Sequence, residues 1–152
     1  MAAMARGADA VVVGHFTGIR DSRVIQGDAP QDRVGYAAAD VLVSELLLGQ
    51  LPTDNVPLEF LLTAPGDPVD QVSELGRSLP TGESVLFLRE KGGAEASLFR
   101  VVNSNGLWTA TTRAPLDTPL AADEPASSKL YAAELAGIQT LAEFIDAVRQ
   151  LR

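Results

Sequence analysis

The sequence predicts a mainly β domain of about six strands, closed by an amphipathic C-terminal α-helix. Short runs of β-branched and aromatic residues recur through the first 113 residues, and turn-forming residues separate them. Glycines inside the first run indicate bends, which favour a barrel over a sandwich. Near the C-terminus the apolar residues follow helical spacing instead. A chain of 152 residues suits one domain, 1–152, because two independent cores would be cramped.

The first run, Ala10–Ile19, is rich in β-branched residues and too short for a long helix, so we expect a strand. Gly14 and Gly18 lie inside this run and indicate a bulge or a bend in the strand. The few residues before Ala8 suit a single helical turn that leads into it.

The next two segments each leave an alternative open. Residues 21–32 are polar and are predicted to form a loop, with a strand extension at Val24–Ile25 as the other interpretation. Alanine and leucine triplets within Tyr36–Leu48 suit a helix, whereas the alternating apolar residues of this segment suit a strand with one apolar face. We favour the strand, and we expect Gly49 to end it.

Later runs predict four more strands: Val56–Thr63, Ser84–Arg89, Ala96–Val102 and Leu107–Thr112. Prolines and glycines between 64 and 79 predict a loop rather than a long element. The segment Asn103–Gly106 predicts a hairpin turn between the last two strands, because Asn-Gly readily adopts positive φ.

The barrel is therefore expected within 1–113, followed by a proline-containing connecting loop over 114–129 and a helical C-terminal segment over 130–152. Thr140 and Glu143 have the spacing of a capping box at the start of the final helix. The apolar stripe of this helix consists of Leu141, Phe144, Ile145, Val148 and Leu151. We expect the stripe to pack on the barrel of the same chain, because a helix this short is marginal alone.

Several of these features together resemble small exported bacterial domains with an OB-like, netrin-module-like β-barrel. The segments that carry the resemblance are Ala8–Gly14, Val43–Gly49, Pro80–Leu88, Asn105–Trp108 and Leu141–Leu151. The resemblance implies an OB-like barrel and a bacterial, exported protein. Netrin-like inhibitors of metalloproteinases use an N-terminal cysteine as a metal ligand, and this chain contains no cysteine, so their mechanism does not transfer.

Composition excludes several classes of partner. The chain carries twelve basic and twenty acidic residues, which gives a net charge of −8, and it has no basic run. Nucleic acid and anionic membranes both require clustered Lys or Arg, so neither is an expected partner. The lack of cysteine also excludes a disulfide framework and a cysteine-ligated zinc site. No apolar run approaches the roughly 20 residues of a membrane-spanning helix.

His15 is the only histidine, so a serine hydrolase would have to use it. The nucleophile would be a serine such as Ser44 or Ser84, and the acid a residue such as Asp40. No Gly-x-Ser-x-Gly motif is present, and His15 lies in the middle of a predicted strand, so a structural role is favoured over catalysis.

The sequence shows no cofactor-binding or metal-binding motif. Asp67, Asp70 and Glu74 fall in one predicted loop, but their spacing does not match a calcium-binding loop, so a solvated acidic surface is favoured. Glycine-rich phosphate-binding motifs are also missing.

Two residues are candidates for a binding surface. Trp108 flanks a predicted turn, whereas the other aromatic residues lie among apolar neighbours that suggest a core. The run Leu46–Leu48 cannot place all three side chains on one face of a strand. Either the helix, a loop or a partner must cover one of them, so Leu48 is a candidate contact and self-association is a hypothesis.

These observations favour a non-enzymatic binding or interaction module, exported from the cytoplasm, over an enzyme. The alternative is a cytoplasmic accessory, inhibitor or immunity-type protein whose acidic face meets a basic protein target. A hydrolase that uses His15 is the third hypothesis. A leader upstream of Met1 would favour export, and an ordinary start there would favour the cytoplasmic alternative.

We predict negligible affinity for single- or double-stranded nucleic acid near physiological salt, because the chain carries a net charge of −8 with only two lysines. A mobility-shift titration should show no complex below about 100 µM protein, the weak end of ordinary non-specific binding. Binding in the low micromolar range at that salt would contradict the prediction.

Overall fold

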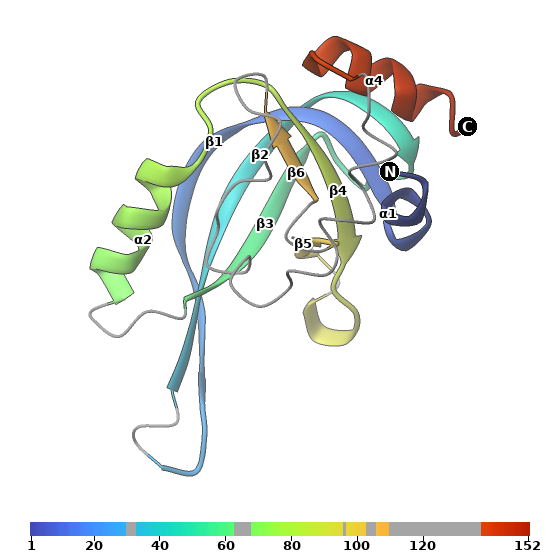
Figure 1. Cartoon of the computed structure of the whole chain (residues 1–152). Coiled ribbons are helices and arrows are strands. Elements are labelled where there is room, and N and C mark those ends of the chain that lie inside the picture. Colours follow the sequence, from blue (N-terminus) through green and yellow to red (C-terminus); the bar gives the residue numbers. More distant parts are fainter. Residues whose placement is uncertain (30–32, 63–67, 96, 103–105, 110–137) are drawn as a thin grey trace.

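The computed structural model describes residues 1–29, 33–62, 68–95, 97–102, 106–109 and 138–152 (Figure 1). The strands are β1 (Ala10–Gln26), β2 (Arg33–Gly49), β3 (Asn55–Leu62), β4 (Ser84–Glu90), β5 (Phe99–Val101) and β6 (Leu107–Thr109). The helices are α1 (Ala2–Gly7), α2 (Pro68–Ser78) and α4 (Leu141–Arg149), with one 3-10 turn, η1 (Gly93–Glu95). The described chain is mainly β with a C-terminal helix, as predicted. The predicted connection 114–129 and the first part of the predicted helical segment, 130–137, lie outside the described residues.

Five strands form a ring in the order β1-β2-β3-β5-β4, and the pairing of β1 with β4 closes it. Neighbouring strands are antiparallel, except that β3 and β5 are parallel and are joined at a single residue pair, Leu58 and Phe99. The closure depends on the 17-residue length of β1. This strand pairs with β2 from end to end, and its first part, Ala10–Gly14, also pairs with β4.

Apolar side chains form two clusters on opposite faces of the ring. The first cluster receives residues from all five ring strands, so it fills the interior. The second cluster lies outside, where α1 and α4 cover β1, β4 and the end of β2. Alternate residues of β1 divide between the clusters, with Val12 in the first and Val11 and Val13 in the second. Burial on both faces explains the uninterrupted apolar runs in β1 and β4.

β2 confirms the strand interpretation of Tyr36–Leu48. Gly49 ends β2 with a φ of 80°, as the sequence led us to expect. A Cβ atom at this position would lie 1.9 Å from the backbone oxygen of Asp9, so only glycine fits there.

β1 continues to Gln26, so the loop interpretation of residues 21–26 is wrong and the alternative, a strand extension at Val24–Ile25, is confirmed. β1 and β2 remain paired as far as Gln26 and Arg33, and they project from the ring as a long hairpin (Figure 1). Strands that face solvent on both sides need no apolar alternation, so their pattern resembles a loop. The bulges predicted from Gly14 and Gly18 are confirmed by register shifts next to each of them.

The prediction of a loop between 64 and 79 is also wrong, because α2 forms there. The proline and the glycine of α2 occupy positions at which a helix tolerates these residues. Pro68 is the first helical residue, where no backbone N–H is needed. Gly76 lies in the last turn, where a Cβ atom would approach the Ile19 side chain to 2.9 Å. α2 places Leu75 in the interior cluster, so its tertiary packing overrides the weak local signal.

The last two strands do not form the predicted hairpin. β5 and β6 are both antiparallel to β4 and therefore run in the same direction. They occupy one edge of β4, because the Phe87 N–H bonds to the Gly106 carbonyl and the Phe87 carbonyl accepts from Val102. Residues 103–105 of the predicted turn Asn103–Gly106 lie outside the described residues.

α4 confirms the predicted helix and its capping box. The Thr140 side chain accepts a hydrogen bond from the Glu143 N–H, and the Glu143 carboxylate accepts from the Thr140 N–H. Phe144 and Val148 are buried in the outer cluster, so the apolar stripe packs on its own chain. Leu151, at the end of the predicted stripe, is exposed instead.

We predict that Phe144→Ala lowers the free energy of unfolding by about 3–5 kcal/mol. The Phe144 ring is 3% exposed, stacks on Trp108 with centroids 4.9 Å apart, and meets the edge of Phe87 at 6.2 Å. Chemical denaturation of the isolated monomer measures the change. Leu151→Ala is the matched control from the same stripe, and we expect it to cost less than about 1 kcal/mol. An unchanged midpoint for Phe144→Ala would mean that the stripe is an interface rather than core.

Candidate functional site

The two residues predicted for a binding surface lie in different surroundings. Trp108 is only 7% exposed, because its ring stacks on Phe144 beneath α4. Leu48, near the end of β2, is half-buried beside the outer cluster. Its neighbour Leu47 is fully buried in that cluster, so the C-terminal helix and its surroundings provide the cover that the leucine run requires. A binding role for Trp108 or Leu48 stays a prediction.

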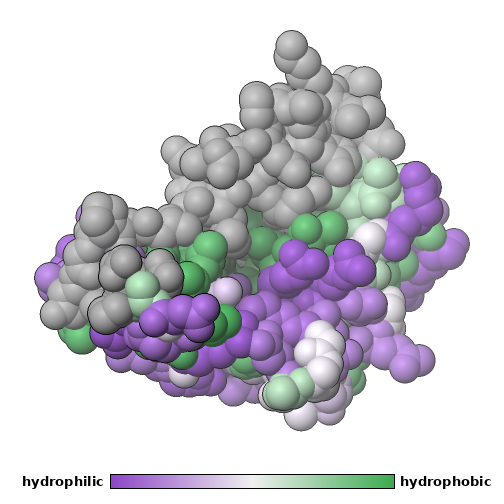
Figure 2. Space-filling model, turned by 90° about the horizontal axis from the view of Figure 1, so that it is seen from below, coloured by the Kyte–Doolittle hydropathy of each residue, from purple (hydrophilic) through white to green (hydrophobic). Residues whose placement is uncertain are grey.

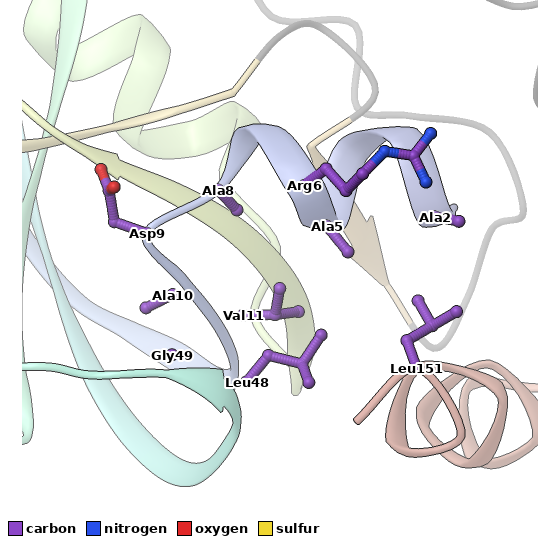
Figure 3. Close-up of a pocket in the computed structure, with 10 residues that line it drawn as sticks. All are labelled: Ala2, Ala5, Arg6, Ala8, Asp9, Ala10, Val11, Leu48, Gly49 and Leu151. Atoms are coloured by element: carbon purple, nitrogen blue, oxygen red, sulfur yellow. The ribbon is translucent and has the colours of Figure 1, made fainter.

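Leu48 lines a hollow of about 330 Å³ where α1 and the end of α4 approach the start of β1 (Figure 3). The side chains of Val11, Leu48 and Leu151 point into this space, whereas the carboxylate of Asp9 points away from it. Asp9 instead accepts a hydrogen bond from the backbone N–H of Glu90. The hollow therefore offers mainly apolar contact and no assembled polar site.

The geometry that a hydrolase needs is not assembled around His15, which lies on β1 opposite Leu42. The Ser44 hydroxyl lies 3.2 Å from each of two acceptors, the Val13 carbonyl and the Glu83 carboxylate, and Ser84 donates to the Gly82 carbonyl. Asp40 accepts from Arg20. None of these three residues bonds to the imidazole, so nucleophile, base and acid are not connected.

The described part of the chain contains no group of three or more His, Asp or Glu residues that could hold a metal ion. Of the acidic residues considered from the sequence, Asp70 and Glu74 lie on the exposed side of α2, and Asp67 lies outside the described residues. Helices of the described chain also lack the length and apolar character that a bilayer crossing requires.

The most unusual polar feature is the side chain of Glu59 on β3, which is completely buried. Arg23 from β1 donates to both of its carboxylate oxygens, with Nε–Oε1 and Nη2–Oε2 distances of 3.0 and 3.1 Å. Ser22 donates to the same carboxylate at 2.6 Å, and Lys91, which follows β4, donates to it as well. Every lone pair that burial would otherwise leave unpaired is thus supplied with a donor.

The same two cations also meet a second carboxylate and an aromatic ring. Glu95 of η1 accepts from Arg23 and lies 3.6 Å from the Lys91 ammonium. Both cations stand over the Tyr36 ring, at 4.4 Å for Arg23 and 4.8 Å for Lys91. We call these residues the Glu59 cluster: Ser22, Arg23, Tyr36, Glu59, Lys91 and Glu95. Its two positive and two negative charges balance, and it ties β1, β2, β3 and η1 together.

Electrostatics keep the Glu59 carboxylate ionised. Burial raises its pKa, but the hydrogen bonds from Arg23, Lys91 and Ser22 outweigh burial and hold the pKa below its ordinary value of 4.5. A carboxyl group with a lowered pKa has no proton to donate near neutral pH, so Glu59 is unsuited to general acid catalysis. The arrangement fixes structure rather than moving protons.

Sequence reasoning missed the Glu59 cluster. One signal was available, because Glu59 is the only charged residue in β3, whose residues are otherwise apolar except for Asn55 at its start. Its partners could not be read from spacing, since Arg23 and Lys91 are 36 and 32 residues away along the chain. Only the strand order brings them together.

A groove of about 540 Å³ adjoins the cluster, between the projecting hairpin and the start of α2. We call it the hairpin groove, and it is lined by Asp21, Ser22, Arg23, Val24, Arg33, Gly35, Tyr36, Leu62 and Val69. Val24 is 45% exposed and Val69 is 63% exposed, so apolar side chains are open to solvent at its walls. Seen from the end from which the hairpin projects, the described surface is mostly hydrophilic, with hydrophobic side chains exposed in several places (Figure 2).

Comparison of the chain with family models, with curated proteins and with solved structures gave no match.

We predict that Glu59→Gln lowers the free energy of unfolding by about 3 kcal/mol at pH 7, because the two partly buried cations Arg23 and Lys91 are then left with Glu95 as the one carboxylate of the cluster. The folded pKa lies below the unfolded one, so the carboxylate stabilises the wild type above about pH 4.5 and stops doing so as pH falls through the folded pKa. The difference between wild type and variant should therefore shrink in acid.

Urea denaturation at several pH values measures this difference. Glu74→Gln is the matched control, since it removes the same charge from the exposed side of α2, and we expect a change within about 0.5 kcal/mol. A Glu59→Gln variant as stable as wild type at pH 7 would show that the cluster contributes nothing net.

Proposed function

We propose that the chain is a non-enzymatic binding module and that a segment of another protein docks in the hairpin groove. The observation that carries the proposal is the groove itself, with solvent-exposed apolar side chains on walls that the Glu59 cluster holds in place. Val24, Ile25 and Val34 are 45, 46 and 39% exposed on the projecting hairpin. Apolar side chains gathered on one projecting element are typical of an interaction surface.

We further propose that the ring is an OB-like barrel. An OB-fold is a five-stranded, partly open barrel that binds ligands on the face of its second and third strands and on the loops between strands 1 and 2 and between strands 4 and 5. A ring of five strands whose β3–β5 seam has one residue pair is consistent with that description. The hairpin groove and the Glu59 cluster involve the corresponding elements of this chain, which supports a binding role for this face.

A protein partner is favoured over a nucleic acid or a substrate. The net charge of −8 repels phosphate backbones. The buried carboxylate is held ionised and paired, and His15 is not joined to a nucleophile or an acid, so the described residues supply no assembled catalytic group. Apolar contact at the edge of a rigid hairpin instead suits recognition of an extended peptide segment.

Selection from a random peptide display library tests this proposal. We expect the wild-type chain to enrich peptides with aliphatic side chains. Synthetic versions of the selected peptides should bind it with a measurable dissociation constant. Val24→Asp should weaken that binding about tenfold or more, because one apolar side chain buried on binding contributes roughly 1.5–3 kcal/mol.

Leu42→Asp is the matched control, because Leu42 is 42% exposed on β2 but does not line the groove. Its affinity for the selected peptides should equal that of the wild type, and thermal midpoints should show that both variants are folded. Equal weakening by the two variants, or a failure to enrich any peptide, would contradict docking in the groove.

A further inference from the structure

The hairpin groove has unpaired charges of opposite sign. Asp21 and Arg33 both line it and both are exposed. Neither side chain forms a hydrogen bond or an ion pair with another described residue, whereas the nearby Arg20 pairs with Asp40 at 3.1 Å. Arg23, the other cation of the groove, is already engaged with Glu59 and Glu95. Asp21 and Arg33 are therefore the lining charges that remain available to a ligand.

The strand register sets the distance between these two charges. Asp21 stands opposite Ala37 on β2, and Arg33 lies four residues before Ala37 on the same strand. At about 3.3 Å per residue, the two charged positions are roughly 13 Å apart along the hairpin. Val24 and Gly35 pair with each other between these positions, and Leu62 and Val69 complete the apolar part of the lining.

We propose that the occupant of the groove is an extended segment of another protein with a basic and an acidic side chain about four residues apart and an aliphatic side chain midway between them. This inference rests on the proposed function and specifies its ligand. The basic side chain meets Asp21 and the acidic side chain meets Arg33. The aliphatic side chain midway between them faces the same side of the segment and meets Val24, Leu62 and Val69. An extended segment rises by the same distance per residue as the hairpin strands, so its spacing matches theirs.

The opposite signs of the two ends disfavour other occupants. A polyanion would gain at Arg33 but would be repelled at Asp21, and a uniformly basic segment would meet the reverse problem. A segment of mixed charge satisfies both ends at once and in one direction only. Charge complementarity of this kind contributes mainly to specificity and to the orientation of the bound segment.

Charge-swap binding measurements test the inference. Three peptides with blocked termini serve as probes: Lys-Ala-Leu-Ala-Glu, Lys-Ala-Leu-Ala-Lys and Glu-Ala-Leu-Ala-Glu, each flanked by Gly-Ser, so that the two charged side chains and the central leucine lie on one face of the extended peptide. We expect the wild type to bind the mixed-charge probe roughly two- to fivefold more tightly than either other probe, the range of exposed ion pairs. Arg33→Asp should prefer the doubly basic probe, and Asp21→Lys should prefer the doubly acidic one.

Arg100→Asp is the matched control, because Arg100 is exposed on β5, does not line the groove, and gives the same change in net charge as Arg33→Asp. It should keep the wild-type preference. Thermal midpoints establish that the variants fold, and sizing of the wild type at the concentrations used reports any occupancy by a second copy.

The outcomes separate the inference from the proposed function. If wild type binds all three probes equally, or none of them, while selected peptides still depend on Val24, the charge inference is wrong and docking in the groove stands. If preferences follow net charge, so that Arg100→Asp behaves like Arg33→Asp, the inference is also wrong. If sizing shows that a second copy of the chain occupies the groove, the inferred partner is wrong and the occupant is this chain itself.

Discussion

The double pairing of β1 is the constraint on which the architecture depends. Its first five residues are shared between β2 and β4, which closes the ring and buries both faces of the strand. Beyond Gly14 the strand leaves β4 and continues with β2 alone. α2 packs against β1 in this region, and the lack of a side chain on Gly76 allows it to approach Ile19. One strand thus builds the core at its start and the exposed hairpin at its end.

The Glu59 cluster stabilises the part of β1 that no longer pairs with β4. A hairpin of two strands is marginal by itself in water, because it cannot bury enough surface. Arg23 and Ser22 on β1 bond to Glu59 on β3, Lys91 after β4 bonds to the same carboxylate, and Arg23 also bonds to Glu95 of η1. The Tyr36 ring on β2 contacts both cations. Buried ion pairs contribute little net stability, but they fix geometry when every group is satisfied. The cluster accordingly holds the stem of the hairpin and one wall of the hairpin groove.

The sequence predicted those parts of the fold in which local pattern and tertiary packing agree. β1 and β4 carry uninterrupted apolar runs because both of their faces are buried, and α4 carries both a cap and a stripe. The outer hairpin and α2 were missed because solvent-facing strands lack alternation, and because proline and glycine fit the ends of a helix as well as a loop. The site was missed for a different reason. Glu59 and Arg23 meet only through the strand order, and the groove combines residues from two strands, the end of β3 and the start of α2.

The two ends of the molecule use their apolar residues differently. At the C-terminal end, α4 covers the outer cluster, and Arg152 donates to the carbonyls of Leu46 and Leu47 on β2. Arg149 adds a bond to each carboxylate oxygen of Glu45, and these hydrogen bonds together with those to Asp146 raise the pKa of Arg149. At that end Phe144 and Val148 are buried against strands of the same chain, and the carbonyls of Leu46 and Leu47 accept hydrogen bonds from Arg152. The hairpin end does the opposite, since its charges near Glu59 are neutralised while its apolar side chains stay open to solvent. If a partner docks there as we propose, the exposed apolar side chains can be covered without breaking an ion pair of the Glu59 cluster, and the cost of desolvating those charges is avoided.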